Sequence, residues 1–155
     1  MRLKLGLLLC MSLMVSPAQP NKDGAEEFQD LIDSLTRWEI MRIIPRAVND
    51  NILEAGGRIQ TEPAVWIIGV RAVPFTITYT YVYDIDAINQ TEPGITEEHV
   101  RKSLNSNAFK EKVINGTCSD PKYFALLDRG FDLEYVYQLE SAARLASFNV
   151  ARSAC

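Results

Sequence analysis

The clearest pattern along the chain is the alternation over residues 75–83, in which every odd position is aromatic or aliphatic and three of the four even positions are threonine. A period of two predicts a β-strand, because successive side chains point to opposite faces of a sheet. The large side chains on one face are Phe75, Ile77, Tyr79, Tyr81 and Tyr83. That row fits either a core buried under a helix or an aromatic platform on which a base or sugar stacks, and we favour the buried core.

Three other segments have the composition of strands. Residues 64–70 form an apolar run rich in β-branched side chains, and Pro74 separates this run from the tyrosine-rich strand. Residues 133–137 alternate in the same way as residues 75–83, and residues 145–150 form a last apolar stretch. The sequence therefore predicts about four strands.

The apolar side chains between residues 23 and 45 recur at helical spacing. They are Phe28, Leu31, Ile32, Leu35, Trp38 and Met41. Asp23 is placed to cap this helix, and Glu26 three residues later completes a capping box. Pro45 should end or kink the helix. We expect one amphipathic helix whose apolar stripe faces the core.

Two further helices are expected in the second half of the chain. Thr96 precedes two glutamates and has the features of an N-cap, so a helix should begin there, weaken at residues 105–107 and stop by Gly116. A shorter helix should open at Pro121, a residue type favoured at the first helical position, and end at Gly130. The predicted order is α-β-β-α-α-β-β, which suits an α+β fold: an antiparallel sheet of about four strands with helices packed on one face.

The N-terminus has the pattern of a secretory signal peptide. Arg2 and Lys4 give a positive start, and the apolar run over residues 6–15 is shorter than the roughly 20 residues that span a bilayer. We predict that residues 1–18 are a cleaved leader and that residues 19–155 form a single α+β domain. The expected location is periplasmic or secreted, without stable membrane insertion after cleavage.

Cysteine usage supports the same compartment. Cys10 lies in the predicted leader, so the mature chain keeps Cys118 and Cys155, the last residue. In an exported chain these two cysteines are expected to form a disulfide, which would order the C-terminus. Closing a loop of this length stabilises the fold by about 3–4 kcal/mol in the chain-entropy model. The alternatives are two free thiols and pairing between chains.

Charge and motifs exclude several function classes. The formal net charge is −4, and removal of Arg2 and Lys4 brings it to −6, with no Lys/Arg cluster left to bind nucleic acid. A zinc site cannot be assembled from His99, the only histidine, and two bridged cysteines. No phosphate-binding loop, dinucleotide fingerprint or nucleophile elbow is present. We therefore predict no catalytic residue, no metal and no cofactor.

The candidate ligand face lies at the end of the tyrosine-rich strand. It comprises Tyr79, Tyr81, Tyr83, Asp84 and Asp86, and its ligand would be a protein or a small molecule. The two aspartates fall on one face if the strand continues, where they could act as an acid–base pair or bind calcium. Solvated charges at a strand end are the ordinary explanation, and we prefer it.

Two triplets match the glycosylation sequon, one beginning at Asn89 and one at Asn115. Such triplets arise often by chance. We interpret both of them only as signs of exposed loops.

Several motifs resemble those of a group of small exported proteobacterial proteins that have no established activity. The motifs are the tyrosine-rich strand, Cys118-Ser119-Asp120-Pro121, Leu126-Leu127-Asp128-Arg129-Gly130, Tyr135-Val136-Tyr137, Pro45-Arg46-Ala47-Val48-Asn49 and the closing Cys155. The resemblance covers most of the mature chain and implies an exported protein with a C-terminal disulfide, but it lends no site residues. Residues 140–144 depart from the group, which often turns there through an Asp-Gly pair.

Three functions are compatible with these features. The leading hypothesis is an exported, non-enzymatic binding or envelope-accessory module. The second is a small hydrolase that uses the carboxylates of Asp84 and Asp86. The third is a cystatin-like inhibitor, which would follow from one helix wrapped by an antiparallel sheet.

Overall fold

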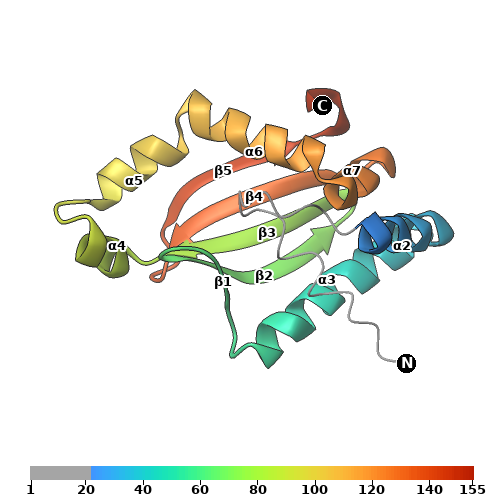
Figure 1. Ribbon diagram of the computed structural model, residues 1–155, viewed down its shortest axis with the longest axis horizontal. Helices are drawn as coiled ribbons and strands as arrows, with labels where there is room; N and C mark the ends of the chain where they lie inside the picture. The colour runs from blue at the N-terminus through green and yellow to red at the C-terminus, as the bar shows by residue number, and fades with distance from the viewer. Residues whose placement is uncertain (1–21) are drawn as a thin grey trace.

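The computed structural model describes residues 22–155, so the predicted leader lies outside the described part of the chain. The helices are α2 (Lys22–Ser34), α3 (Arg37–Glu54), α4 (Ile85–Thr91), α5 (Glu97–Leu104), α6 (Asn107–Ser119) and α7 (Pro121–Asp128), with a final turn η1 (Arg152–Ala154). The strands are β1 (Ile59–Glu62), β2 (Val65–Val73), β3 (Thr76–Tyr83), β4 (Asp132–Leu139) and β5 (Arg144–Val150). Figure 1 shows a twisted sheet with α3 along its β2 side and α5 and α6 along its β5 side.

The α+β class is confirmed, but two details of the predicted sheet are wrong. The sheet has five strands in the order β1-β2-β3-β4-β5, and β3 pairs with β4 in parallel. A parallel neighbour requires the chain to return to the same end of the sheet, and the helices α4 to α7 make that return. The additional strand β1 is only four residues long and carries no run of large side chains, so its sequence gives no strand signal.

The tyrosine-rich strand is β3, and its tyrosine face is the core face of the sheet. Ile77, Tyr79 and Tyr81 are 0%, 1% and 3% exposed. The parallel register sets Tyr79 opposite Tyr135 and Tyr81 opposite Tyr137. The paired rings stack with centroids 5.7 Å and 5.2 Å apart, which adds aromatic contact energy to the burial of apolar area.

The predicted first helix is two helices, α2 and α3. Thr36 is the N-cap of α3 and forms a capping box with Glu39, so the helix restarts there. Trp38 consequently lies outside the core and is 71% exposed. Pro45 does not end α3, which continues to Glu54. Both Pro45 and its neighbour Ile44 are buried, and this packing against the core stabilises the helix on either side of the proline.

The long helix expected after Thr96 is also divided. Thr96 caps α5 as predicted, and the chain breaks at the predicted weak point, where Ser106 caps α6. Helix α6 continues past Gly116 to Ser119, so Cys118 lies in its last turn. The predicted helix that begins at Pro121 is confirmed as α7.

The intramolecular disulfide between Cys118 and Cys155 is formed, with the two Cα atoms 5.4 Å apart. It joins the C-terminal tail to the end of α6. Arg152 in the same tail forms an ion pair with Asp128 at 2.6 Å and stacks on Phe124. The last residues are thus held by covalent and non-covalent contacts together.

Candidate functional site

A groove of about 220 Å³ opens between α4, α5 and the end of β3. Its lining is mostly apolar: Tyr83, Ile88, Ile95, Val100, Leu104 and Phe109. Three polar side chains complete it, those of Glu92, His99 and Ser103. We call this feature the α4–α5 groove.

The floor of the groove is aromatic and continuous with the core. The rings of Tyr83 and Phe109 both contact Tyr137 edge to face, with centroids 6.1 Å and 5.5 Å away. Burial, together with the negative charge of Glu62, raises the pKa of the Tyr83 phenol well above its usual range, so this side chain stays neutral even in alkaline solution. The floor therefore rests on the packed tyrosine stack and is rigid.

One wall of the groove depends on Asn89. The Nδ2 group of Asn89 donates to the carbonyls of Ile85 at 3.1 Å and Ile95 at 2.7 Å, and its Oδ1 accepts the N–H of Gly94 at 2.9 Å. These bonds join α4 to the loop that leads into α5. They fix the positions of Glu92 and Ile95 at the mouth of the groove.

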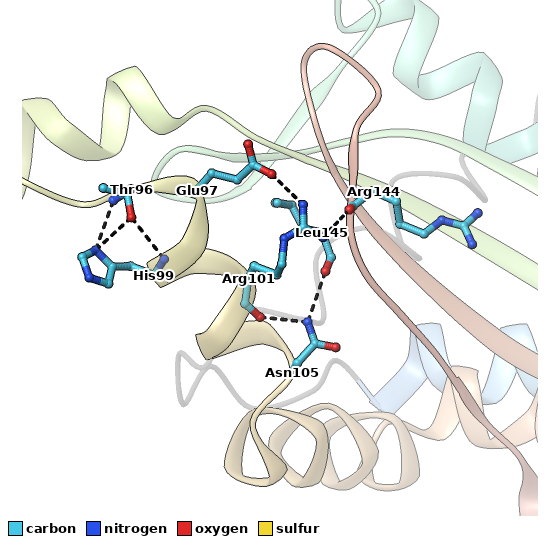
Figure 2. A network of polar contacts seen from close by, with 7 residues as sticks. All are labelled: Thr96, Glu97, His99, Arg101, Asn105, Arg144 and Leu145. Atoms are coloured by element: carbon cyan, nitrogen blue, oxygen red, sulfur yellow. Dashed lines mark hydrogen bonds and ion pairs between the residues drawn. The ribbon is translucent and has the colours of Figure 1, made fainter.

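The opposite wall, α5, is fastened to the edge strand β5 (Figure 2). Arg101 donates from Nη1 to the carbonyl of Arg144 at 2.8 Å and from Nη2 to Glu97 at 2.6 Å. Asn105 donates to the carbonyl of Leu145 at 3.1 Å. Both contacts use backbone acceptors that an edge strand leaves free, so they position the helix and cover the sheet edge at once.

His99 has a structural role at the start of α5. Its Nδ1 accepts the backbone N–H of Thr96 at 3.3 Å, which gives the imidazole the place that Glu or Gln takes in a capping box (Figure 2). The proton of the neutral ring then lies on Nε2. In this arrangement Nε2 is a hydrogen-bond donor, and Ser103 lies one turn further along α5.

The residues of the predicted ligand face are separated by the fold. Tyr83 lines the groove, whereas Tyr79 and Tyr81 lie in the core. The strand ends at Tyr83, so the two aspartates do not continue its face: Asp84 caps α4 by accepting the N–H of Ala87 at 2.9 Å, and Asp86 lies in the first turn of that helix.

Sequence reasoning missed α4 and with it one wall of the groove. The signal was present, since Asp84 is a good cap and Ile85 and Ile88 are spaced for one helix face. The two sequons also lie in helices rather than loops, Asn89 in α4 and Asn115 in α6.

Within residues 22–155 no group of three or more His, Cys, Asp or Glu side chains is arranged to hold a metal ion. In the same part of the chain, no helix combines the length and the apolar character needed to cross a bilayer.

No family model matches the chain, and no curated protein matches its sequence. Among solved structures, the fold is similar to that of a protein from Pseudomonas aeruginosa that is predicted to be secreted, with a TM-score of 0.57 and 15% identity over 79% of this chain and 97% of the other. The pilotin EpsS of the Vibrio vulnificus type 2 secretion system aligns with a TM-score of 0.48 and 15% identity, covering 77% of this chain and 97% of EpsS. The type II secretion system pilotin AspS of Vibrio cholerae aligns with a TM-score of 0.45 and 17% identity, covering 76% and 97%. At these identities the likeness concerns the fold alone.

Proposed function

We propose that this chain is an exported, non-enzymatic module that binds a segment of another protein in the α4–α5 groove. The observation that supports this proposal most directly is the groove itself. Its volume of about 220 Å³ is below the roughly 300–1,000 Å³ of sites that enclose a small ligand, but it suits an anchoring side chain. An apolar floor with a few polar groups at the rim is the composition of a protein-recognition site.

The disulfide between Cys118 and Cys155 supports the exported location, because such bonds persist in oxidising compartments. The predicted secretion of the Pseudomonas aeruginosa protein is compatible with that context. We propose a periplasmic or secreted module in which the predicted leader is removed, and an accessory role in the cell envelope falls under the same proposal.

Neither alternative function gains support from the geometry. The carboxyl groups of Asp84 and Asp86 belong to the start of α4, and Asp84 is engaged as its cap, so the strand-end pair of the hydrolase hypothesis is not assembled. The cystatin-like hypothesis required an antiparallel sheet wrapped around one helix. The parallel pairing of β3 with β4 and the helices between them do not have that architecture.

The proposal is tested by site-specific photo-crosslinking in cells that export the protein. A photoreactive phenylalanine replaces Ser103, which lines the groove, or Lys102, its exposed neighbour on α5 that does not. We expect a discrete protein adduct from position 103 and none from position 102. The adduct at 103 should be lost in the variant Ile88→Glu, which puts a charge on the groove wall, and kept in Leu53→Glu, on an exposed apolar residue of α3.

Equal labelling from positions 102 and 103, or an adduct that survives Ile88→Glu, would reject the groove as the binding site. Circular dichroism of each purified variant confirms that the fold is retained, so loss of the adduct reports on binding.

A further inference from the structure

Among residues 22–155, Glu92 is the one acidic side chain in the lining of the α4–α5 groove. It is the C-cap of α4, and its backbone N–H donates to the carbonyl of Ile88 at 2.8 Å. A carboxylate at this place faces the negative end of the helix dipole, which is unfavourable for the helix. In residues 22–155 no cation or hydrogen-bond donor pairs with the Glu92 carboxylate.

The described residues around this carboxylate supply no counterion for it. The segment 84–100 contains five acidic residues and neither lysine nor arginine. Two of the cations that follow on the adjoining helices are engaged elsewhere, and the other two, Lys102 on α5 and Lys110 on α6, form no ion pair with Glu92. Arg101 binds Glu97 and the Arg144 carbonyl, and Lys112 on α6 pairs with Glu62 at 4.0 Å.

We propose that the segment bound in the groove carries a bulky apolar side chain, which packs on Tyr83 and Phe109, next to a lysine or arginine that pairs with Glu92. This inference rests on the proposed function and specifies the chemistry of the partner. An apolar anchor matches the floor, and a cation satisfies both the unpaired carboxylate and the C-terminal end of α4.

Three peptides with a common anchor test the charge preference: acetyl-Gly-Lys-Leu-Phe-Lys-Gly-amide and its counterparts with Gln or Glu in place of both lysines. Each is titrated into the isotope-labelled protein with its disulfide formed, and amide shifts are followed by NMR. The lysine peptide should shift amides of the groove, those of Ile95, Val100 and Ser103 among them. It should bind about two- to fivefold more tightly than the Gln peptide, the effect expected of one exposed ion pair, and the Glu peptide should bind least.

The preference should depend on Glu92 alone. In Glu92→Gln the lysine and Gln peptides should bind equally, and in Glu92→Lys the Glu peptide should bind best. Glu98→Gln is the matched control, because Glu98 is exposed in the first turn of α5 and does not line the groove.

Equal affinities for the three peptides, a preference that persists in Glu92→Gln, shifts confined to other surfaces, or no binding of any peptide would each overturn this inference. The crosslinking result judges the proposed function separately. A groove-dependent protein adduct together with charge-independent peptide binding would keep the proposed function and reject the cationic partner.

Discussion

The side-chain amide of Asn89 lies 2.7 Å from the carbonyl oxygen of Ile95 and joins α4 to the loop before α5. The same side chain bonds Ile85 and Gly94, so one residue organises the connection between the two walls of the groove. Asn89 is therefore a positioning residue: it does not line the groove, but its bonds hold the loop that contains Ile95, which does.

Replacing Asn89 by alanine should loosen this connection. Removing the side chain leaves the part-buried carbonyl of Ile95 and the exposed N–H of Gly94 without their partner, so we expect a loss of about 0.5–1.5 kcal/mol in the free energy of unfolding. Urea denaturation measures it. Asn115→Ala is the control, because Asn115 is exposed on α6, and it should change stability by less than about 0.5 kcal/mol. Equal effects of the two substitutions would show that Asn89 does not fasten the loop.

Asn49 of α3 covers the part of β2 that extends beyond its pairing with β1, where β2 has an open edge. Its side chain donates to the carbonyl of Val70 at 2.7 Å and accepts the N–H of Val70 at 2.8 Å, as a neighbouring strand would. Asn49→Leu should cost about 1–3 kcal/mol and increase self-association through the exposed edge. Denaturation and light scattering test this prediction. Asn51→Ala provides the comparison, because the Asn51 amide bonds only Ala47 within the same helix, and a loss as large as that of Asn49→Leu would contradict the edge role.

Reduction of the Cys118–Cys155 disulfide should destabilise the protein by about 3–4 kcal/mol through the entropy of the unfolded chain. Urea denaturation with and without reductant gives this difference. The protein should stay folded near neutral pH, since Arg152 keeps its contacts with Asp128 and Phe124. Alkylation of both thiols in the native protein without prior reduction would contradict the bond.

The buried phenols predict alkaline destabilisation. Burial raises the pKa of Tyr83, Tyr123, Tyr135 and Tyr137 above the ordinary value. In the unfolded chain these groups lose their protons near about pH 10, whereas the folded protein retains them. Their contribution to stability is therefore complete below that pH and decreases as pH rises above it.

Urea denaturation at a series of alkaline pH values measures this decrease, and tyrosinate absorbance should appear together with unfolding. In Tyr83→Phe the decrease should be smaller, because one of the perturbed phenols is gone. Ionisation of all tyrosines near pH 10 in a protein that stays folded would contradict the prediction.

Signals that depend on neighbouring residues predicted several strands and helix starts correctly. Alternation of side chains located β3 and β4, and caps located the starts of α5 and α7, because each of these signals depends only on neighbours in the chain. The division of the first helix at Thr36 was missed although the residues of the capping box are local, because the apolar stripe continued through it.

What the sequence determined by itself was the α+β class, the buried tyrosine face and the two cysteines available for a bond, since composition and periodicity are properties of the chain alone. The tertiary structure alone decided that β3 and β4 run in parallel, because the direction of pairing follows from how the helices between them pack. It also decided that Tyr83, Glu92 and His99 share one groove. These residues come from a strand end, a helix end and a helix start, and only the packing of α4 and α5 against the sheet brings them together.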